Sequence, residues 1–174
     1  MTTINKNFKV APLVKIIKSA TFNFIEFHDD HAYFTDGIII VKADIQEVFN
    51  YISDKDIKKL NGKAIRAIDI KTITGHDLKI ETDGISCNDC DIRVSFIDKR
   101  SIIRETFDNI MKGEPDNSDF TFRLKEISLL HDILGNRKIT IDIINKRFVH
   151  GVEGDNFFEF VIGNIQKHDK RRSI

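Results

Sequence analysis

The fold of this chain is decided by residues 21–41, which read TFNFIEFHDDHAYFTDGIIIV. Aromatic and β-branched residues dominate three short runs, which are separated by Asp29-Asp30 and by Asp36-Gly37. Runs of this composition favour strands, and Asp-Gly steps favour hairpin turns. We therefore expect a three-stranded antiparallel meander over these residues.

A strand and a helix are expected immediately before this meander. Residues 8–10 form a short alternating stretch, and the next residues show helical spacing of apolar side chains. One helical face would carry Val10, Leu13, Val14 and Ile17. Together with the meander, these elements make one strand–helix–three-strand unit.

The same pattern returns in the second half of the chain. A strand over 120–124, a helical stretch ending at Leu134 and three alternating runs between 138 and 162 follow in the same order. Self-similarity at a long period is a fold-level signal. We expect one α+β domain of antiparallel sheets with two to three helices on one face. It would be built from duplicated units at about 5–97 and 98–166.

The segment between the two patterns is less regular. It predicts helical turns over 45–49 and 54–60, strands over 65–73, 77–82 and 91–96, and a turn at Asp83-Gly84. Ser101 is then expected to N-cap a helix whose apolar face carries Ile103, Phe107 and Ile110.

Charge and hydropathy limit the classes of function. The 27 basic and 27 acidic residues cancel, which argues against tight DNA binding by charge alone, because phosphate neutralisation dominates that affinity. The longest apolar runs hold four to five residues, whereas a spanning helix needs about 20. Residues 1–6 have no apolar segment of the signal-peptide type. We expect a cytoplasmic protein without a membrane span.

The duplicated unit resembles the domain of the DNA sliding clamp superfamily, such as the bacterial polymerase III β subunit. His31-Ala32-Tyr33-Phe34 leading into Thr35-Asp36-Gly37 resembles the clamp strand that ends in a Thr-Asp-Gly turn. The Phe-rich runs at 120–134 and 157–162 resemble the end of a clamp domain. Clamp rings contain six such domains, and this chain holds material for one, so a ring would need six copies.

The resemblance implies a non-enzymatic protein without cofactors that contacts duplex DNA independently of sequence. It also implies a homo-oligomer, with polymerase or other replication proteins as partners. Clamp helices present basic residues to the DNA backbone, so the DNA-binding candidates are Lys15, Lys18, Lys99, Arg100, Arg104, Arg123, Lys125, Arg137 and Lys138. Residues 167–174 form a basic tail. The competing interpretation is that these side chains are the ordinary solvated faces of amphipathic helices.

Cys87-Asn88-Asp89-Cys90 is a C-x₂-C pair. A structural zinc site needs four ligands, and the chain has no second cysteine pair. His76 and His131 could complete a site, but their spacing does not indicate one. The pair is therefore interpreted as a turn that holds two incidental thiols, and no metal is predicted.

Two further polar groupings carry no predicted chemistry. His28-Asp29-Asp30-His31 is interpreted as a polar hairpin turn. Asp36, Lys42 and Asp44 resemble a metal-nuclease strand, but the Glu-x-Lys pattern is absent because Ile40 stands two residues before the lysine. No catalytic residue is predicted. The alternatives to a clamp are a stand-alone interaction module that binds a protein through a sheet edge or apolar groove, and a small hydrolase whose site the sequence does not reveal.

Overall fold

The structure is a computed structural model, and it describes residues 1–6, 23–97, 101–116, 124–145, 147–154 and 158–163. The helices in these ranges are α2 (Ile45–Val48), α3 (Asp54–Leu60), α4 (Ala67–Ile73), α5 (Ile102–Met111) and α6 (Leu124–Leu134). The strands are β1 (Thr3–Ile4), β2 (Phe24–His28), β3 (His31–Thr35), β4 (Ile39–Asp44), β5 (Phe49–Asn50), β6 (Lys63–Arg66), β7 (Leu78–Ile80), β8 (Gly84–Cys87), β9 (Arg93–Ser95), β10 (Pro115–Asp116), β11 (Ile139–Ile144), β12 (Phe148–Glu153) and β13 (Phe158–Gly163). The expected α+β class with antiparallel sheets is confirmed.

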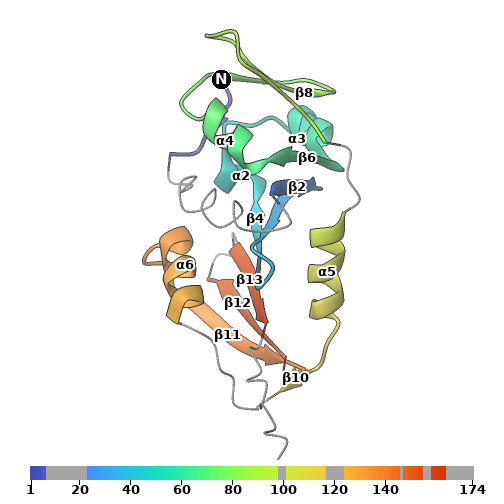
Figure 1. Ribbon diagram of the computed structural model, residues 1–174, viewed down its shortest axis with the longest axis vertical. Helices are drawn as coiled ribbons and strands as arrows, with labels where there is room; N and C mark the ends of the chain where they lie inside the picture. The colour runs from blue at the N-terminus through green and yellow to red at the C-terminus, as the bar shows by residue number, and fades with distance from the viewer. Residues whose placement is uncertain (7–22, 98–100, 117–123, 146, 155–157, 164–174) are drawn as a thin grey trace, which may run out of the picture.

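The largest element is an eight-stranded sheet in the order β10-β11-β12-β13-β4-β3-β2-β6 (Figure 1). Both predicted meanders are confirmed, as β2-β3-β4 and as β11-β12-β13. They meet where β4 pairs antiparallel with β13, with Val41 opposite Phe160. Read outward from this junction, the three strands of each meander therefore follow in the same order, from the last to the first, whereas the outer strands differ because β10 precedes its meander and β6 follows its own. The internal duplication stays a prediction, because strand order alone does not establish it.

The two faces of this sheet carry different helices. Successive side chains of a strand point to opposite faces, so Phe34 lies in one apolar cluster with Ile133 of α6, and Tyr33 lies in the other with Phe107 of α5. Helices α5 and α6 therefore flank the sheet on opposite sides (Figure 1). The expectation that the helices share one face is wrong for α5, because the apolar stripe of this helix matches the Tyr33 face.

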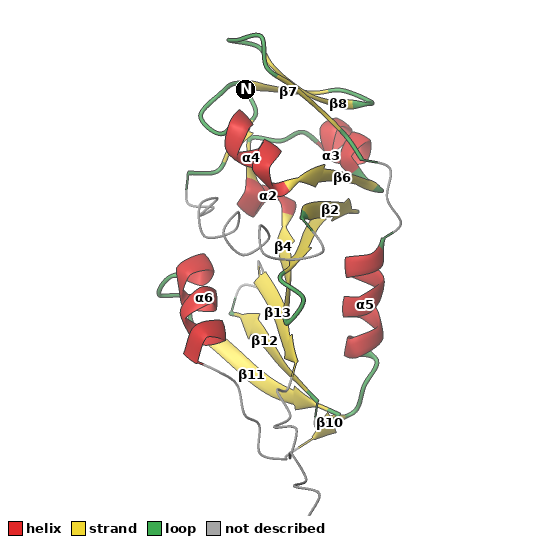
Figure 2. Cartoon of the chain, in the orientation of Figure 1, coloured by secondary structure: helices red, strands yellow, loops and turns green. Residues whose placement is uncertain are grey.

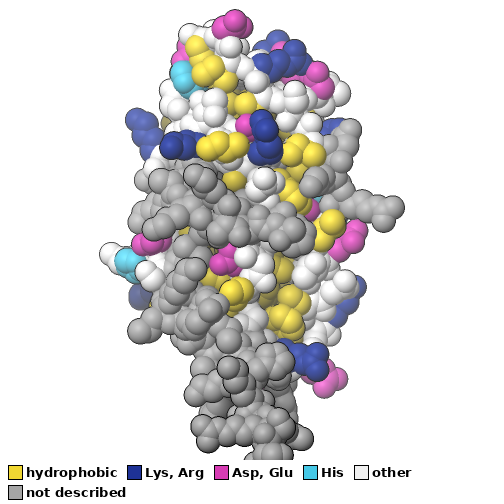
Figure 3. All heavy atoms as spheres, viewed as in Figure 1, with side chains coloured by type: hydrophobic (Ala, Val, Ile, Leu, Met, Phe, Trp, Pro, Cys, Tyr) yellow, Lys and Arg dark blue, Asp and Glu magenta, His cyan; other side chains and the backbone are white. Residues whose placement is uncertain are grey.

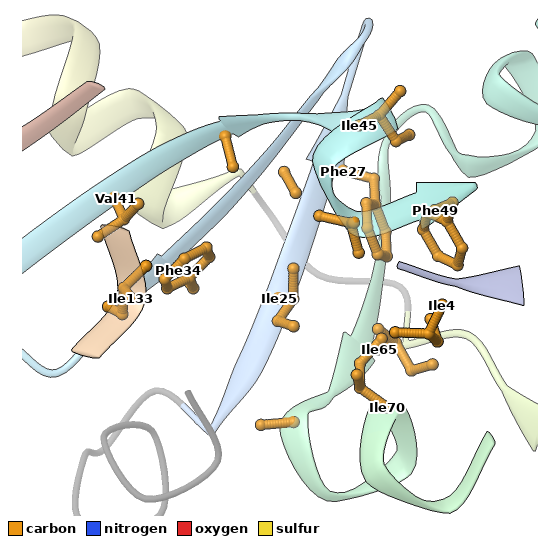
Figure 4. Packing of buried hydrophobic residues seen from close by; sticks show 14 of the residues in the cluster. Ile4, Ile25, Phe27, Phe34, Val41, Ile45, Phe49, Ile65, Ile70 and Ile133 are labelled. Atoms are coloured by element: carbon orange, nitrogen blue, oxygen red, sulfur yellow. The ribbon is translucent and has the colours of Figure 1, made fainter. Parts of the chain in front are cut away.

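The larger cluster extends from α6 across the sheet to the segment that follows β4. Figure 4 shows Ile133 beside Phe34 and Val41 at one end of it, and Phe27 beside Phe49 at the other. The rings of Phe27 and Phe49 have centroids 5.9 Å apart. Helix α3 has the predicted bounds, and α2 begins as predicted but ends one residue earlier, at Val48; Asp44 and Ser53 are their N-caps.

The prediction of a strand over 65–73 is wrong beyond residue 66, where α4 begins. The β-branched composition favours a strand, but burial follows the helical period. Ala67, Ile70 and Ile73 are buried, while Ile68 is 50% exposed. Tertiary packing of one helical face outweighs the local strand preference.

A separate three-stranded sheet, β7-β8-β9, lies at the end of the molecule far from β10 (Figure 2). Strands β7 and β9 agree with the predicted strands, but β8 was not expected. It begins at Gly84 itself, so the turn is tighter than the sequence indicated. The hairpin places Cys87 opposite Leu78.

Several predicted elements lie outside the described residues, namely the strand at 8–10, the helix after it and the basic tail at 167–174. Of the predicted strand at 120–124, only Leu124 is described, and it begins α6 instead. In the described ranges, no helix combines the length and apolar character that crossing a bilayer requires.

Candidate interaction surfaces and ligand cluster

The Thr35-Asp36-Gly37 turn is held by its own side chains. The Thr35 hydroxyl donates to the Ile39 carbonyl at 2.6 Å and accepts from the Gly37 N–H at 2.9 Å. Asp36 Oδ1 accepts from the N–H groups of Ile38 and Ile39, both at 2.8 Å. Gly37 has a φ of 90°, which a residue without a Cβ adopts at little cost. The motif therefore builds the β3–β4 connection and aligns Ile38 beside it.

Helix α5 is positioned by a carboxylate from the sheet. Glu26 of β2 is 1% exposed and accepts from the N–H of Ile103 at 3.0 Å and from that of Arg104 at 3.1 Å. The expected cap, Ser101, precedes the helix, but its side chain makes no capping hydrogen bond. Burial raises the pKa of Glu26 above its ordinary value, although the helix N–H groups act to lower it. The cap thus comes from a residue 77 positions away in sequence.

A groove of about 600 Å³ runs between α5 and the sheet. Its walls are mainly apolar and include Ile102, Ile110, Phe148 and Val161, with Gly37 at the β3–β4 turn. Ile102 is 43% exposed. Figure 3 shows hydrophobic side chains at the surface between α5 and the sheet. A concave, mainly apolar surface with a few polar groups, here Thr106, Asn109 and Asn145, is typical of a binding site.

Beside the groove lies an ion network on the α5 face of the sheet. Lys42 Nζ is 2.5 Å from Glu159 Oε1, and His150 Nε2 is 3.3 Å from Glu159 Oε2. The Lys42 ammonium also lies 5.9 Å from the centroid of the Phe107 ring. The hydrogen bond from His150, followed by that from Lys42, lowers the pKa of Glu159 to about 2. The opposite charges of Lys42 and Glu159 compensate each other, as expected of a partly buried ion pair with a structural role.

A second apolar strip follows α6 and the exposed strand β11. Ile127, Ile139 and Ile141 are 40%, 37% and 57% exposed. A hollow of about 270 Å³ between them is lined by Leu130 and by the sheet. Exposed apolar side chains on a strand near the end of a sheet are typical of an association surface.

Three of the predicted DNA-binding side chains lie in the described part of the chain, and they do not form one surface. Arg104 lies on α5 and pairs with Asp108, with Nε 3.3 Å from Oδ2. Arg137 follows α6 at the opposite face of the sheet, and Lys138 next to it is exposed. The other candidates, Lys15, Lys18, Lys99, Arg100, Arg123 and the side chain of Lys125, lie outside the described residues.

Arg137 already has two carboxylate partners. Its guanidinium lies 2.8 Å from Glu47 and 3.0 Å from Glu153, and it stacks over the Phe158 ring at 4.8 Å from the centroid. These contacts join α2, β12 and β13. Arg137 therefore has a structural role, holding these three elements together, which the local sequence did not indicate.

His76 lies beside the C-x₂-C pair, although the sequence spacing did not indicate it. Its imidazole and the side chains of Cys87, Asp89 and Cys90 place their ligand atoms within 4.8 Å of one another. This group is the one cluster of three or more potential metal ligands in the described ranges, and His131 is not part of it. The proximity of His76 to the cysteines depends on β8, which the sequence did not predict. In the β7–β8 hairpin, the pairing of Leu78 with Cys87 sets residue 76 opposite residue 89.

The remaining polar groupings have structural roles. His28 is buried opposite His31 in the β2–β3 hairpin, and His31 Nδ1 lies 2.6 Å from Asp30 Oδ1. Asp44 caps α2 by accepting from Gln46 N–H at 2.7 Å. Lys42 pairs with Glu159, so Asp36, Lys42 and Asp44 do not converge on one site.

The comparisons with known proteins identify the fold. No family model and no curated protein sequence matches the chain. Among solved structures, the chain is similar to a "Putative DNA polymerase III beta subunit" from Eubacterium rectale, with a TM-score of 0.58 and 12% sequence identity. The match covers 95% of this chain and 64% of that one, so this chain spans less than two thirds of its length. The fold is therefore sliding-clamp-like, as the sequence resemblance predicts.

Proposed function

We propose that this protein is a non-catalytic, clamp-like factor that assembles into an oligomer and contacts the backbone of duplex DNA in replication or repair. The observation that carries this proposal is the sliding-clamp-like fold, which is similar to a structure described as a "Putative DNA polymerase III beta subunit" and which contains two joined meanders. A clamp acts by topology and electrostatics, so it needs no catalytic cluster. Contacts to phosphates hold a protein on DNA without reading sequence.

Assembly is an essential part of the proposal, because the chain holds material for one clamp domain. The apolar strip of Ile127, Ile139 and Ile141 supports it, since these side chains would be buried between copies. Polymerase or other replication proteins are the partners that this function implies.

The DNA contacts are proposed for the predicted basic residues other than Arg137, whose guanidinium is engaged by Glu47 and Glu153. The resemblance to clamps implies that Lys15, Lys18, Arg123 and Lys125 are presented to the DNA backbone. Among the described candidates, Lys138 is exposed, and Arg104 lies on α5 at the other face of the sheet.

Light scattering on the pure protein tests assembly, and duplex binding at several salt concentrations tests the DNA contact. We expect an oligomer whose affinity falls with salt by about 0.9 in log K per log unit for each phosphate contacted. The triple variant Lys15→Gln, Lys18→Gln, Lys138→Gln should reduce that slope by about one for each phosphate that is no longer neutralised. The control is Lys71→Gln, an exposed lysine on α4. A monomer without duplex affinity at low salt would refute the proposal.

A stand-alone protein-interaction module is the second candidate, and the groove beside α5 is the observation that favours it. Apolar grooves of this kind accept the apolar side chains of a peptide. The single variant Ile102→Asp places a charge on the exposed wall of the groove. If the module is correct, this variant loses partner capture and DNA affinity is absent from the parent. A parent that binds DNA with unchanged affinity in Ile102→Asp supports the clamp instead.

A further inference from the structure

The end of the β7-β8-β9 sheet carries four ligand-bearing side chains that the proposed function does not use. His76 precedes β7, Cys87 ends β8, and Asp89 and Cys90 lie in the connection to β9. His76 Nδ1 is 3.2 Å from Asp89 Oδ2 and 3.4 Å from Cys90 Sγ. All four ligand atoms lie within 4.8 Å of one another. Asp89 is exposed, and His76 and Cys90 are half-buried, so an ion could reach the cluster from solvent.

These separations can be compared with the edges of a zinc tetrahedron. Zinc lies about 2.3 Å from sulfur and about 2.0–2.1 Å from nitrogen or oxygen, so the tetrahedral edges are about 3.3 Å for N···O and about 3.6 Å for S···N. The His76–Asp89 and His76–Cys90 distances fall within a few tenths of an ångström of these edges. Small side-chain adjustments would therefore complete the coordination sphere.

We propose that His76, Cys87, Asp89 and Cys90 bind one zinc ion in a closed, structural Cys₂-His-Asp site. Two thiolates and an imidazole select zinc over calcium and magnesium, which prefer oxygen ligands. The carboxylate of Asp89 fills the fourth position, which a catalytic site would leave open.

The backbone around the cluster holds its two halves in place. Gly75 has a φ of 92°, and this turn brings His76 back toward the hairpin. The Asn88 N–H donates to the Asp77 carbonyl at 2.8 Å, and the Asn88 side-chain amide donates to the Asp77 carboxylate at 3.1 Å. The Cys87 N–H donates to the Ile92 carbonyl at 2.9 Å. These hydrogen bonds hold the ligand-bearing segments close together without an ion.

An ion at this place would stabilise a small sheet that has little core of its own. Leu78, Ile80, Ile85 and Val94 are the buried apolar side chains of the three strands. The Asp77 carboxylate has a buried oxygen without a hydrogen-bond partner in the described part of the chain. A bound zinc would join the start of β7 to the β8–β9 connection.

Metal analysis of the full chain, purified under reducing conditions from zinc-supplemented cells, tests the proposal. We expect about one zinc per chain. After removal by a chelator, Co²⁺ alone should give the visible spectrum of a tetrahedral ion with thiolate-to-metal charge transfer. Zn²⁺ alone should raise the melting temperature of the stripped protein, because an ion that binds only the folded state stabilises it.

Substitutions identify the ligands. His76→Asn and Cys90→Ser should weaken Zn²⁺ binding by more than the roughly 10- to 100-fold that loss of an outer-shell partner costs. The matched control, His131→Asn, removes an exposed histidine of α6 and should bind like the parent. Asp89→Asn should also bind more weakly.

Two results would overturn the proposal. One is a reduced parent chain that binds neither Zn²⁺ nor Co²⁺. The other is His76→Asn with parental affinity. The cobalt spectrum of the parent decides the matter even if a variant fails to fold.

Discussion

Glu26 illustrates how one buried carboxylate links a strand to a helix. It sits on β2, yet it accepts the hydrogen bonds that the first turn of α5 cannot make within the helix. Because burial raises its pKa, the folded protein binds its proton more tightly than the unfolded chain does. Its titration therefore contributes stability below its ordinary pKa of 4.5, and that contribution is lost as the pH rises through the folded pKa.

Replacing Glu26 with Ala should lower the free energy of unfolding by about 1–2 kcal/mol, the usual cost of losing a helix cap. Urea denaturation at neutral pH measures this. Ser101→Ala is the matched control, and it should change stability little because the Ser101 side chain caps nothing. A larger loss in Ser101→Ala than in Glu26→Ala would show that the local residue is the true cap.

Among the groups on the α5 face of the sheet, Glu159 should contribute most to the loss of folding stability at acidic pH. Its pKa is about 2 when folded and 4.5 as an ordinary value, so the folded state binds fewer protons between these limits. The stability it contributes is present above pH 4.5 and is lost as the pH falls toward 2. Glu159→Gln should remove about 2 kcal/mol of this acid-dependent stability, allowing for partial exposure.

Stability measured by urea denaturation across that pH range tests the Glu159 prediction. The control is Glu114→Gln, which replaces an exposed carboxylate and should lose stability at acidic pH as the parent does. If Glu159→Gln lost stability between pH 4.5 and 2 to the same extent as the parent, the assignment of this pH dependence to Glu159 would be contradicted. At neutral pH the variant should also be less stable, because Lys42 would stay partly buried without its counter-charge.

Among the elements, the pairing of β12 with β13 depends on a glycine, because there is no room for a larger side chain at position 151. Gly151 lies opposite Phe160, and a Cβ at Gly151 would come 2.1 Å from the Phe160 ring. The ring therefore packs directly over the backbone of β12. This packing belongs to the cluster that also holds α6 against the sheet.

Gly151→Ala should destabilise the fold by about 1–3 kcal/mol, the usual cost of overpacking a core. Thermal and urea denaturation measure it. Gly154→Ala is the control, since nothing lies within 4 Å of a Cβ at Gly154. Equal stability of the two variants would mean that the Phe160 ring moves aside without cost.

At the scale of the molecule, the exposed apolar strip on α6 and β11 is the surface where copies would meet. Ile141 is its most exposed member at 57%. A charge placed there would stay in water in a monomer but would be buried in an assembly, which is costly.

Ile141→Asp should therefore shift the oligomer to monomer at micromolar concentration, as measured by light scattering, without loss of folded structure by circular dichroism. Ile68→Asp provides the control, because Ile68 is similarly exposed but lies on α4. An assembly that survives Ile141→Asp would place the interface between copies elsewhere.

Local sequence was sufficient to predict both meanders, helices α2, α3, α5 and α6, and the clamp-like class of the fold. These features follow from local periodicity and turn chemistry. The Asp36-Gly37 turn is held by the side chain of Asp36 itself, and the helix from Asp54 to Leu60 is capped by Ser53, the residue just before it. The duplication, the DNA contacts and the ring are predictions that the sequence raised.

The features that join residues distant in sequence became visible in the three-dimensional fold. It made residues 67–73 a helix, because one helical face is buried. It placed α5 and α6 on opposite faces of the sheet, engaged Arg137 with two carboxylates, and took the cap of α5 from Glu26. It also carried His76 to Cys87 and Cys90 through the β7–β8 register. The physical reason is common to all: burial, charge pairing and ligand geometry depend on distance in space, which local periodicity does not encode.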